Sequence, residues 1–183
     1  MQKKFTSNLL VRSLLAVAFV SSAPFTASAG DGTINFTGSI LDSACTINST
    51  SNSQTVNLGS IQRTAFKASG DVTAATRFDI VLENCPDTVK SASVKFDGTA
   101  NAANNNILAL NSGQTAQGVG VALFEKDGVT AIPLSTQSAQ MTLDNNQETN
   151  RNVMSFVAKY QATQASVGAG TANATSDFTI IYQ

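Results

Sequence analysis

Short stretches in which every second residue is apolar recur along this chain of 183 residues. A period of two places all the apolar side chains of a stretch on one face of a β-strand. Turn-forming residues separate the stretches, as in the hairpin dipeptide Asp127-Gly128 and the predicted loops 104–106 and 144–146. Residues 61–75 are compatible with a helical turn. The pattern predicts a single all-β domain, a sandwich or a barrel. The alternating stretches are residues 34–36, 40–46, 55–58, 78–82, 92–96, 107–110, 119–123, 141–143, 154–160 and 178–182.

The final stretch, SDFTIIYQ, keeps its apolar residues up to the penultimate position. Phe178, Ile180 and Tyr182 fall on one face of the predicted strand. The last residues of a domain usually fray and carry little apolar surface. We therefore expect this strand to pack against other residues along its whole length.

The stretch GDGTINFTGSI, residues 30–40, has a different character. Gly30, Gly32, Ile34 and Phe36 share one face of the alternation, and half of that face is bare glycine. Such a strand adds little apolar surface to the core of its own domain. It is either an ordinary edge strand or an arm that inserts into a groove elsewhere.

The first 29 residues have the layout of a secretory signal peptide. Basic residues flank a short apolar run, Leu14 to Val20, which is too short to span a bilayer. Small residues follow, and the triplet Ala27-Ser28-Ala29 predicts cleavage after Ala29. A second site at Ser21-Ser22-Ala23 would place Pro24 just after the cut, and it is the poorer candidate.

Cleavage after Ala29 leaves 154 of the 183 residues, a length that suits one domain with one core. This mature chain carries eight basic and twelve acidic residues, and therefore a net charge of −4. We expect neither nucleic acid nor an anionic membrane as a partner, because the chain has no basic patch. No later stretch is long and apolar enough to anchor it, so the sequence predicts an exported product.

Cys45 and Cys85 are the two cysteines of the chain. An exported protein enters an oxidising compartment, where two cysteines are expected to pair as a disulfide. A metal site is not expected, because the chain has no histidine and two thiols are too few ligands.

The residue inventory leaves little room for catalysis. Without histidine, Ser-His-Asp and Cys-His arrangements are impossible. Carboxylate pairs such as Glu83 with Asp87, or Glu125 with Asp127, would suit a glycosidase. The second pair flanks the predicted hairpin turn, however, where solvated acids are ordinary. The sequence predicts no enzyme, no cofactor and no small-molecule substrate.

A secreted carbohydrate-binding β-sandwich is the alternative from another functional class. Sugar sites usually present exposed aromatic side chains, but this chain has no tryptophan and two tyrosines, Tyr160 and Tyr182. Both tyrosines are in phase with apolar neighbours, and this favours packing in the core over a role in sugar binding.

Three segments of the chain resemble the type 1-like pilins of bacterial chaperone–usher fimbriae. GTINFTGSILDSACTI, residues 32–47, resembles the N-terminal extension of these pilins and their first cysteine strand. RFDIVLENC, residues 77–85, resembles the strand with the second cysteine. AKYQATQASVGAGTANATSDFTIIYQ, residues 158–183, resembles their closing segment, with Gly170 fourteenth from the end and Tyr182 penultimate.

The resemblance implies an incomplete immunoglobulin-like β-sandwich that lacks its last strand and is completed by a donor strand from a neighbouring subunit. It implies a signal peptide at residues 1–29, a donor-strand extension at 30–40 and a pilin domain at 41–183. The implied donor residues are Gly30, Gly32, Ile34 and Phe36, and the implied groove-edge and chaperone-binding residues are Gly170, Phe178, Ile180 and Tyr182.

The resemblance also implies a function and partners. The chain would be a structural subunit that polymerises by donor-strand exchange into an adhesive fimbria on the bacterial cell surface. We expect a major shaft subunit first, and a minor or terminating subunit second. The implied partners are a periplasmic pilus chaperone, an outer-membrane usher and other pilin subunits.

Overall fold

The computed structural model describes residues 32–38, 40, 44–73, 75–146 and 150–183. The chain divides into two units, residues 1–39 and residues 40–183. Within the first unit, the described residues 32–38 carry neither helix nor strand, and Ile34 and Phe36 are 78% and 92% exposed. The predicted signal peptide, both of its cleavage sites and Gly30 lie outside the described residues.

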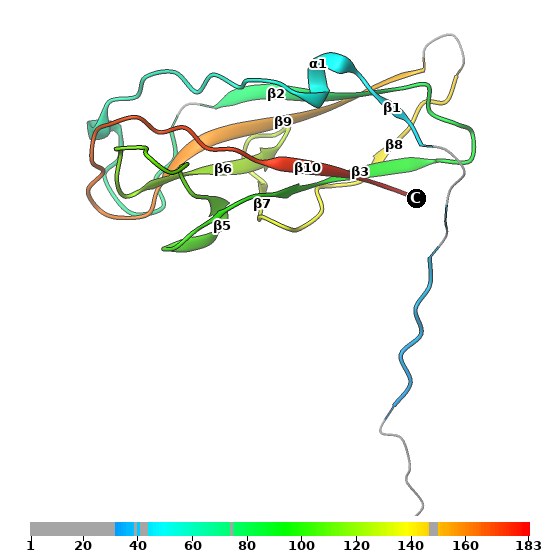
Figure 1. Ribbon diagram of the computed structural model, residues 1–183, viewed down its shortest axis with the longest axis horizontal. Coiled ribbons are helices and arrows are strands. Elements are labelled where there is room, and N and C mark those ends of the chain that lie inside the picture. The colour runs from blue at the N-terminus through cyan, green and yellow to red at the C-terminus, as the bar shows by residue number, and fades with distance from the viewer. Residues whose placement is uncertain (1–31, 39, 41–43, 74, 147–149) are drawn as a thin grey trace, which may run out of the picture. The chain divides into compact units, whose positions relative to one another are not determined.

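The second unit is built almost entirely of strands (Figure 1). One short helix, α1, covers Ser49–Asn52, and a single 3₁₀ turn, η1, covers Arg63–Ala65 within the stretch predicted to hold a helical turn. The strands are β1 (Thr46–Ile47), β2 (Thr76–Glu83), β3 (Ser91–Asp97), β4 (Ala100–Asn101), β5 (Asn104–Leu108), β6 (Val119–Glu125), β7 (Ala131–Ile132), β8 (Met141–Thr142), β9 (Arg151–Ala162) and β10 (Asp177–Tyr182).

These strands form two sheets. The larger has the order β1-β2-β9-β6-β5-β4, with β7 alongside β6, and the smaller has the order β10-β3-β8. All the strand pairs are antiparallel. The long strand β9 lies between β2 and β6, and β10 runs beside β3 (Figure 1).

The main core lies between the two sheets. Ile80 and Leu82 of β2 pack with Val94 of β3, and all three are fully buried. Phe156 of β9 and Phe96 of β3 meet edge to face across the sandwich, with ring centroids 5.1 Å apart. Burial of each such side chain contributes roughly 1.5–3 kcal/mol. The prediction of an all-β sandwich is confirmed.

The sequence pattern predicts most strands correctly, but several stretches differ. Residues 34–36 carry no strand, residues 55–58 are extended but pair with no strand among the described residues, and residues 104–106, predicted as a loop, are the beginning of β5. The asparagines of β5 are tolerated in a strand because their side chains are exposed or half-buried, near the polar edge of the larger sheet. Polar composition alone therefore predicted a loop where the chain forms a strand next to the edge of the sheet.

The predicted disulfide is present between Cys45 and Cys85, 40 residues apart in the sequence. It joins the segment before β1 to the residues after β2, which are neighbouring strands. Asn150 supports this point through its side chain, which accepts a hydrogen bond from the Cys85 N–H at 2.8 Å and donates one to the Cys85 carbonyl at 3.0 Å.

In the part of the chain that the structure describes, no helix has the length and apolar character of a membrane span.

Candidate functional site

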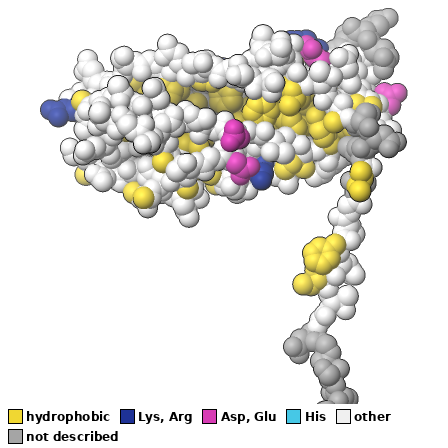
Figure 2. Space-filling model, in the orientation of Figure 1, with side chains coloured by type: hydrophobic (Ala, Val, Ile, Leu, Met, Phe, Trp, Pro, Cys, Tyr) yellow, Lys and Arg dark blue, Asp and Glu magenta, His cyan; other side chains and the backbone are white. Residues whose placement is uncertain are grey.

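An open groove of about 880 Å³ runs across the second unit. Its floor is apolar because β2, β9, β6 and β3 direct their core-facing side chains into it. The space-filling view shows these apolar side chains as a band between polar margins (Figure 2). The floor residues are Phe78, Ile80, Phe96, Leu108, Val121, Leu123, Ala158 and Tyr160.

The first wall of the groove is the extended segment 53–58, which follows α1. Among the described residues, the backbone groups of residues 54–58 have no hydrogen-bond partner. Side chains fix its near end instead: the Gln54 amide donates to the Asp79 carbonyl at 3.1 Å, and the Ser51 hydroxyl accepts from the Val81 N–H at 3.0 Å. An extended segment with unpaired backbone groups is a template for another strand.

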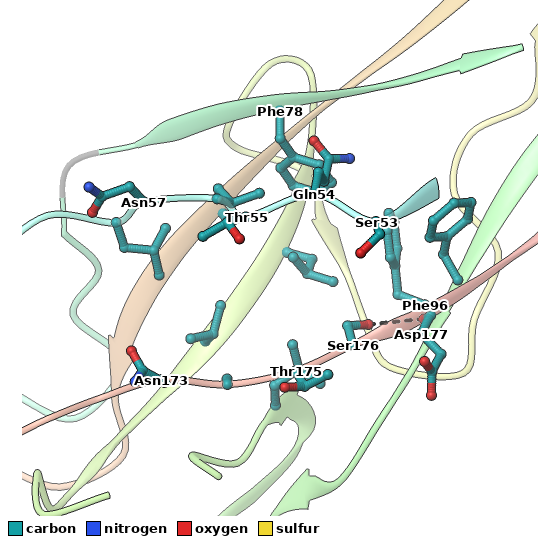
Figure 3. A pocket seen from close by; sticks show the side chains of 18 of the residues that line it. Ser53, Gln54, Thr55, Asn57, Phe78, Phe96, Asn173, Thr175, Ser176 and Asp177 are labelled. Atoms are coloured by element: carbon teal, nitrogen blue, oxygen red, sulfur yellow. Dashed lines mark hydrogen bonds between the residues drawn. The ribbon is translucent and has the colours of Figure 1, made fainter. Parts of the chain in front are cut away.

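The second wall consists of residues 172–176 and the strand β10 that follows them. Strand β10 pairs with β3 along one edge, and within the described residues its other edge pairs with no strand. Figure 3 shows Asn173, Thr175 and Ser176 along this side of the cavity and Ser53, Gln54 and Thr55 along the other. The groove thus has an apolar floor and two walls with free strand edges.

A second cavity of about 440 Å³ continues the groove toward the 3₁₀ turn. Phe66 and Val119 line it, together with residues 167–173, and these include Gly170. Tyr160 and Ala172 line both cavities and therefore mark the junction between them.

Charge is sparse in the groove. Asp177 is the one carboxylate in the lining of the larger cavity, and Arg63 is the one basic residue in the lining of the smaller. Burial raises the pKa of both Tyr160 and Tyr182, and the hydroxyl groups of these tyrosines donate to the carbonyls of Ala172 and Cys45. A groove of this kind can bind apolar side chains and the backbone of an extended chain.

The structure brings together some of the residues that the sequence singled out. Phe178, Ile180 and Tyr182 are partly buried and pack against the main core from the inner face of β10, so the whole strand is packed. Gly170 lies at the second cavity. Gly32, Ile34 and Phe36 belong to the separate unit 1–39.

Two parts of the site do not follow from the sequence pattern. The alternation at 55–58 predicts a strand, whereas this segment is the first wall of the groove and pairs with no strand among the described residues. Tyr160 was interpreted as a packing residue, which is correct, but its position at the junction of two cavities depends on the distant segment 167–173.

Comparisons with known proteins agree with this geometry. A family profile described as "Fimbrial protein" matches residues 34–183. The chain is 35% identical over 182 residues to the probable major fimbrial subunit LpfA of Escherichia coli O157:H7, an alignment that covers 98% of this chain and 99% of the relative.

Solved structures point the same way. The crystal structure of an antigen and type I fimbria protein of Burkholderia pseudomallei is 38% identical, with a TM-score of 0.59, over 82% of this chain and 97% of that chain. The P pilus rod subunit PapA shares the fold at 21% identity and a TM-score of 0.63, over 77% of this chain and 100% of that chain.

The chain belongs to the fimbrial protein family, whose members are type 1-like pilins with an immunoglobulin-like fold. It is a structural subunit that assembles with other pilin subunits in a fimbria exported to the bacterial cell surface, and it is not an enzyme.

Proposed function

We propose that this chain polymerises by donor-strand exchange, in which the arm at residues 30–40 of one subunit fills the groove of the next. The observation that carries the proposal is the pair of groove walls with unpaired strand edges above an apolar floor. This is the geometry that β-augmentation requires: backbone hydrogen bonds provide affinity, and alternate side chains fill pockets.

The arm has the complementary chemistry. Ile34 and Phe36 are spaced two residues apart and are exposed, so their apolar surface has no cover in the free chain. Burial in a neighbour would contribute roughly 1.5–3 kcal/mol for each side chain. Each new backbone hydrogen bond to the groove walls would add about 1 kcal/mol net. Gly30 and Gly32, on the same face, would let the strand lie close to the floor.

Head-to-tail repetition of this contact gives a filament and not a closed ring. The donor and acceptor surfaces are different parts of the chain. However many subunits are added, one arm stays unused at one end of the assembly and one groove at the other. A homopolymer of this kind would be the fimbrial shaft. The relative LpfA is described as a probable major fimbrial subunit, and its similarity over nearly the whole chain supports a shaft subunit over a minor or terminating one.

The open groove also implies a need for protection during export. An apolar trench with two free strand edges is an aggregation hazard. We propose that a periplasmic chaperone occupies the groove first, along Gly170 and the β10 residues Phe178, Ile180 and Tyr182. An outer-membrane usher would then present the subunit for exchange with the arm of the next one.

The test is complementation by a peptide. A variant that begins at Leu41 lacks the arm, and its unfolding midpoint is measured with and without a synthetic peptide of residues 30–40. We expect a large upward shift, because the peptide binds the folded state alone. A peptide with Ile34→Asp and Phe36→Asp should have no effect.

The matched control carries Thr33→Asp and Asn35→Asp, which add the same charge to the opposite face of the strand. This peptide should still stabilise the domain. A domain that is stable without any peptide and indifferent to all three would overturn the proposal, since its fold would then be complete.

A further inference from the structure

Residues 171–175, which include most of the second wall before β10, form almost all of their hydrogen bonds with one exposed loop, residues 111–116. Thr171 and Asn173 exchange hydrogen bonds with residues 111–116: the Asn111 N–H donates to the Asn173 carbonyl at 2.8 Å, and the Ala116 N–H donates to the Thr171 carbonyl at 3.0 Å. Asn173 N–H donates to the Gln114 side chain at 2.9 Å. These contacts fix the wall relative to that loop, but they do not fix its distance from the floor.

The alternation of an extended chain then determines where the remaining backbone groups point. Successive residues direct their N–H and C=O groups to opposite sides. Since the backbone groups of Thr171 and Asn173 face the 111–116 loop, we infer that Ala172 and Ala174 direct theirs away from it, toward the groove. Ala172 and Ala174 are therefore the backbone positions available to an added strand.

Tyr160 connects this wall to the floor. Its hydroxyl donates to the Ala172 carbonyl at 3.0 Å. The wall continues after residue 175 into β10, which pairs with β3. Among the described residues, every other hydrogen bond of residues 171–175 themselves goes to residues 111–116, so only Tyr160 bonds these five residues to a sheet. It comes from β9, which is paired on both sides, with Tyr160 directly opposite Val121 of β6.

We infer that the Tyr160 hydroxyl is a positioning group for strand addition, which holds the wall at 171–175 at the distance that an incoming strand requires. Neighbouring strands pair at about 4.7–4.9 Å, so a wall that shifts outward weakens the ladder. A carbonyl oxygen has two lone pairs, and Ala172 can therefore keep Tyr160 as a donor while it accepts an N–H from the added strand. This inference rests on the proposed strand exchange.

The experiment uses the full mature chain and the substitution Tyr160→Phe, which removes the hydroxyl and keeps the ring. A fluorescent peptide of residues 30–40 is bound in excess and then chased with unlabelled peptide, and the release rate is measured. We expect release from Tyr160→Phe to be about twofold to tenfold faster than from the wild type, the range given by one net hydrogen bond. Amide exchange at Ala172 and Ala174 in the peptide-bound protein should also be faster.

The matched control is Thr136→Val, which removes a hydroxyl that donates to the Pro133 carbonyl at 2.7 Å in an exposed turn outside the lining of both cavities. Its release rate should stay within about twofold of the wild type, less than the loss of one hydrogen bond. Equal rates for wild type and Tyr160→Phe, or equal acceleration by both variants, would overturn the inference. A wild-type chain that binds no peptide would instead overturn the proposed strand exchange itself.

Discussion

Removal of the disulfide between Cys45 and Cys85 should cost a large share of the stability of the folded domain. The bond closes a loop with a sequence separation of 40, for which the chain-entropy relation gives about 4 kcal/mol. Small domains are stable by about 5–15 kcal/mol in total, so this is a quarter of the stability or more.

The surroundings of the bond indicate what a substitution adds. Cys85 is 1% exposed and belongs to the main core, so replacing both cysteines with alanine removes buried sulfur as well as the crosslink. We expect roughly 1 kcal/mol more from the small cavity. The Asn152 amide, which contacts the Cys85 sulfur at 3.6 Å, loses a weak acceptor for one N–H and keeps its bond to the Asp144 carbonyl at 3.0 Å with the other.

The assay is urea unfolding in the presence of saturating arm peptide. With a slope of about 2 kcal/mol per M, reduction of the wild type should lower the midpoint by about 2 M. The midpoint of the double variant Cys45→Ala, Cys85→Ala should be slightly lower still, and reducing agent should not change it. A loss below about 1 kcal/mol on reduction would refute the reasoning, since the crosslink would then restrict the unfolded chain far less than its length implies.

Three further predictions follow from the core, the wall and the buried tyrosines. Phe156→Ala should lower the free energy of unfolding by about 3–5 kcal/mol, because Phe156 is 2% exposed and packs against Phe78 and Phe96. Phe156→Leu should lower it much less. Equal losses for the two variants in urea unfolding would contradict this. Gly170→Ala should lower the free energy of unfolding by about 1–3 kcal/mol in the same assay, because an added Cβ would lie too close to the backbone nitrogen of Ala116 and force the wall to shift. An unchanged midpoint would show that the wall can shift at no cost in stability. Burial raises the pKa of Tyr160 and Tyr182 above the ordinary value of 10.0, so their contribution to stability is complete below that pH and is lost as the pH rises through and above it. The urea midpoint should fall as the pH rises above about 10, and a Tyr160→Phe, Tyr182→Phe variant with an identical fall would exclude the tyrosines as its cause.

Local patterns in the sequence were sufficient for the class of fold and for its strongest strands. Alternation over 78–82, 92–96, 119–123, 154–160 and 178–182 predicted β2, β3, β6, β9 and β10, because burial of one face requires that period in any sheet. The disulfide was predictable because the chain has two cysteines and a signal peptide pattern. Polar stretches were less informative: the asparagines at 104–106 begin β5, next to the edge of the larger sheet, where their side chains are exposed or half-buried.

The sequence by itself determined that β10 would carry apolar residues to its end, and that Ile34 and Phe36 would share one face of any strand they form. Only the tertiary structure decided that β10 and the segment 53–58 form opposite walls of one groove with free edges. It also decided that Tyr160 would reach Ala172 across that groove. The physical reason is that periodicity states which face of a segment is buried, whereas the partner of each strand edge depends on contacts between residues far apart in the chain.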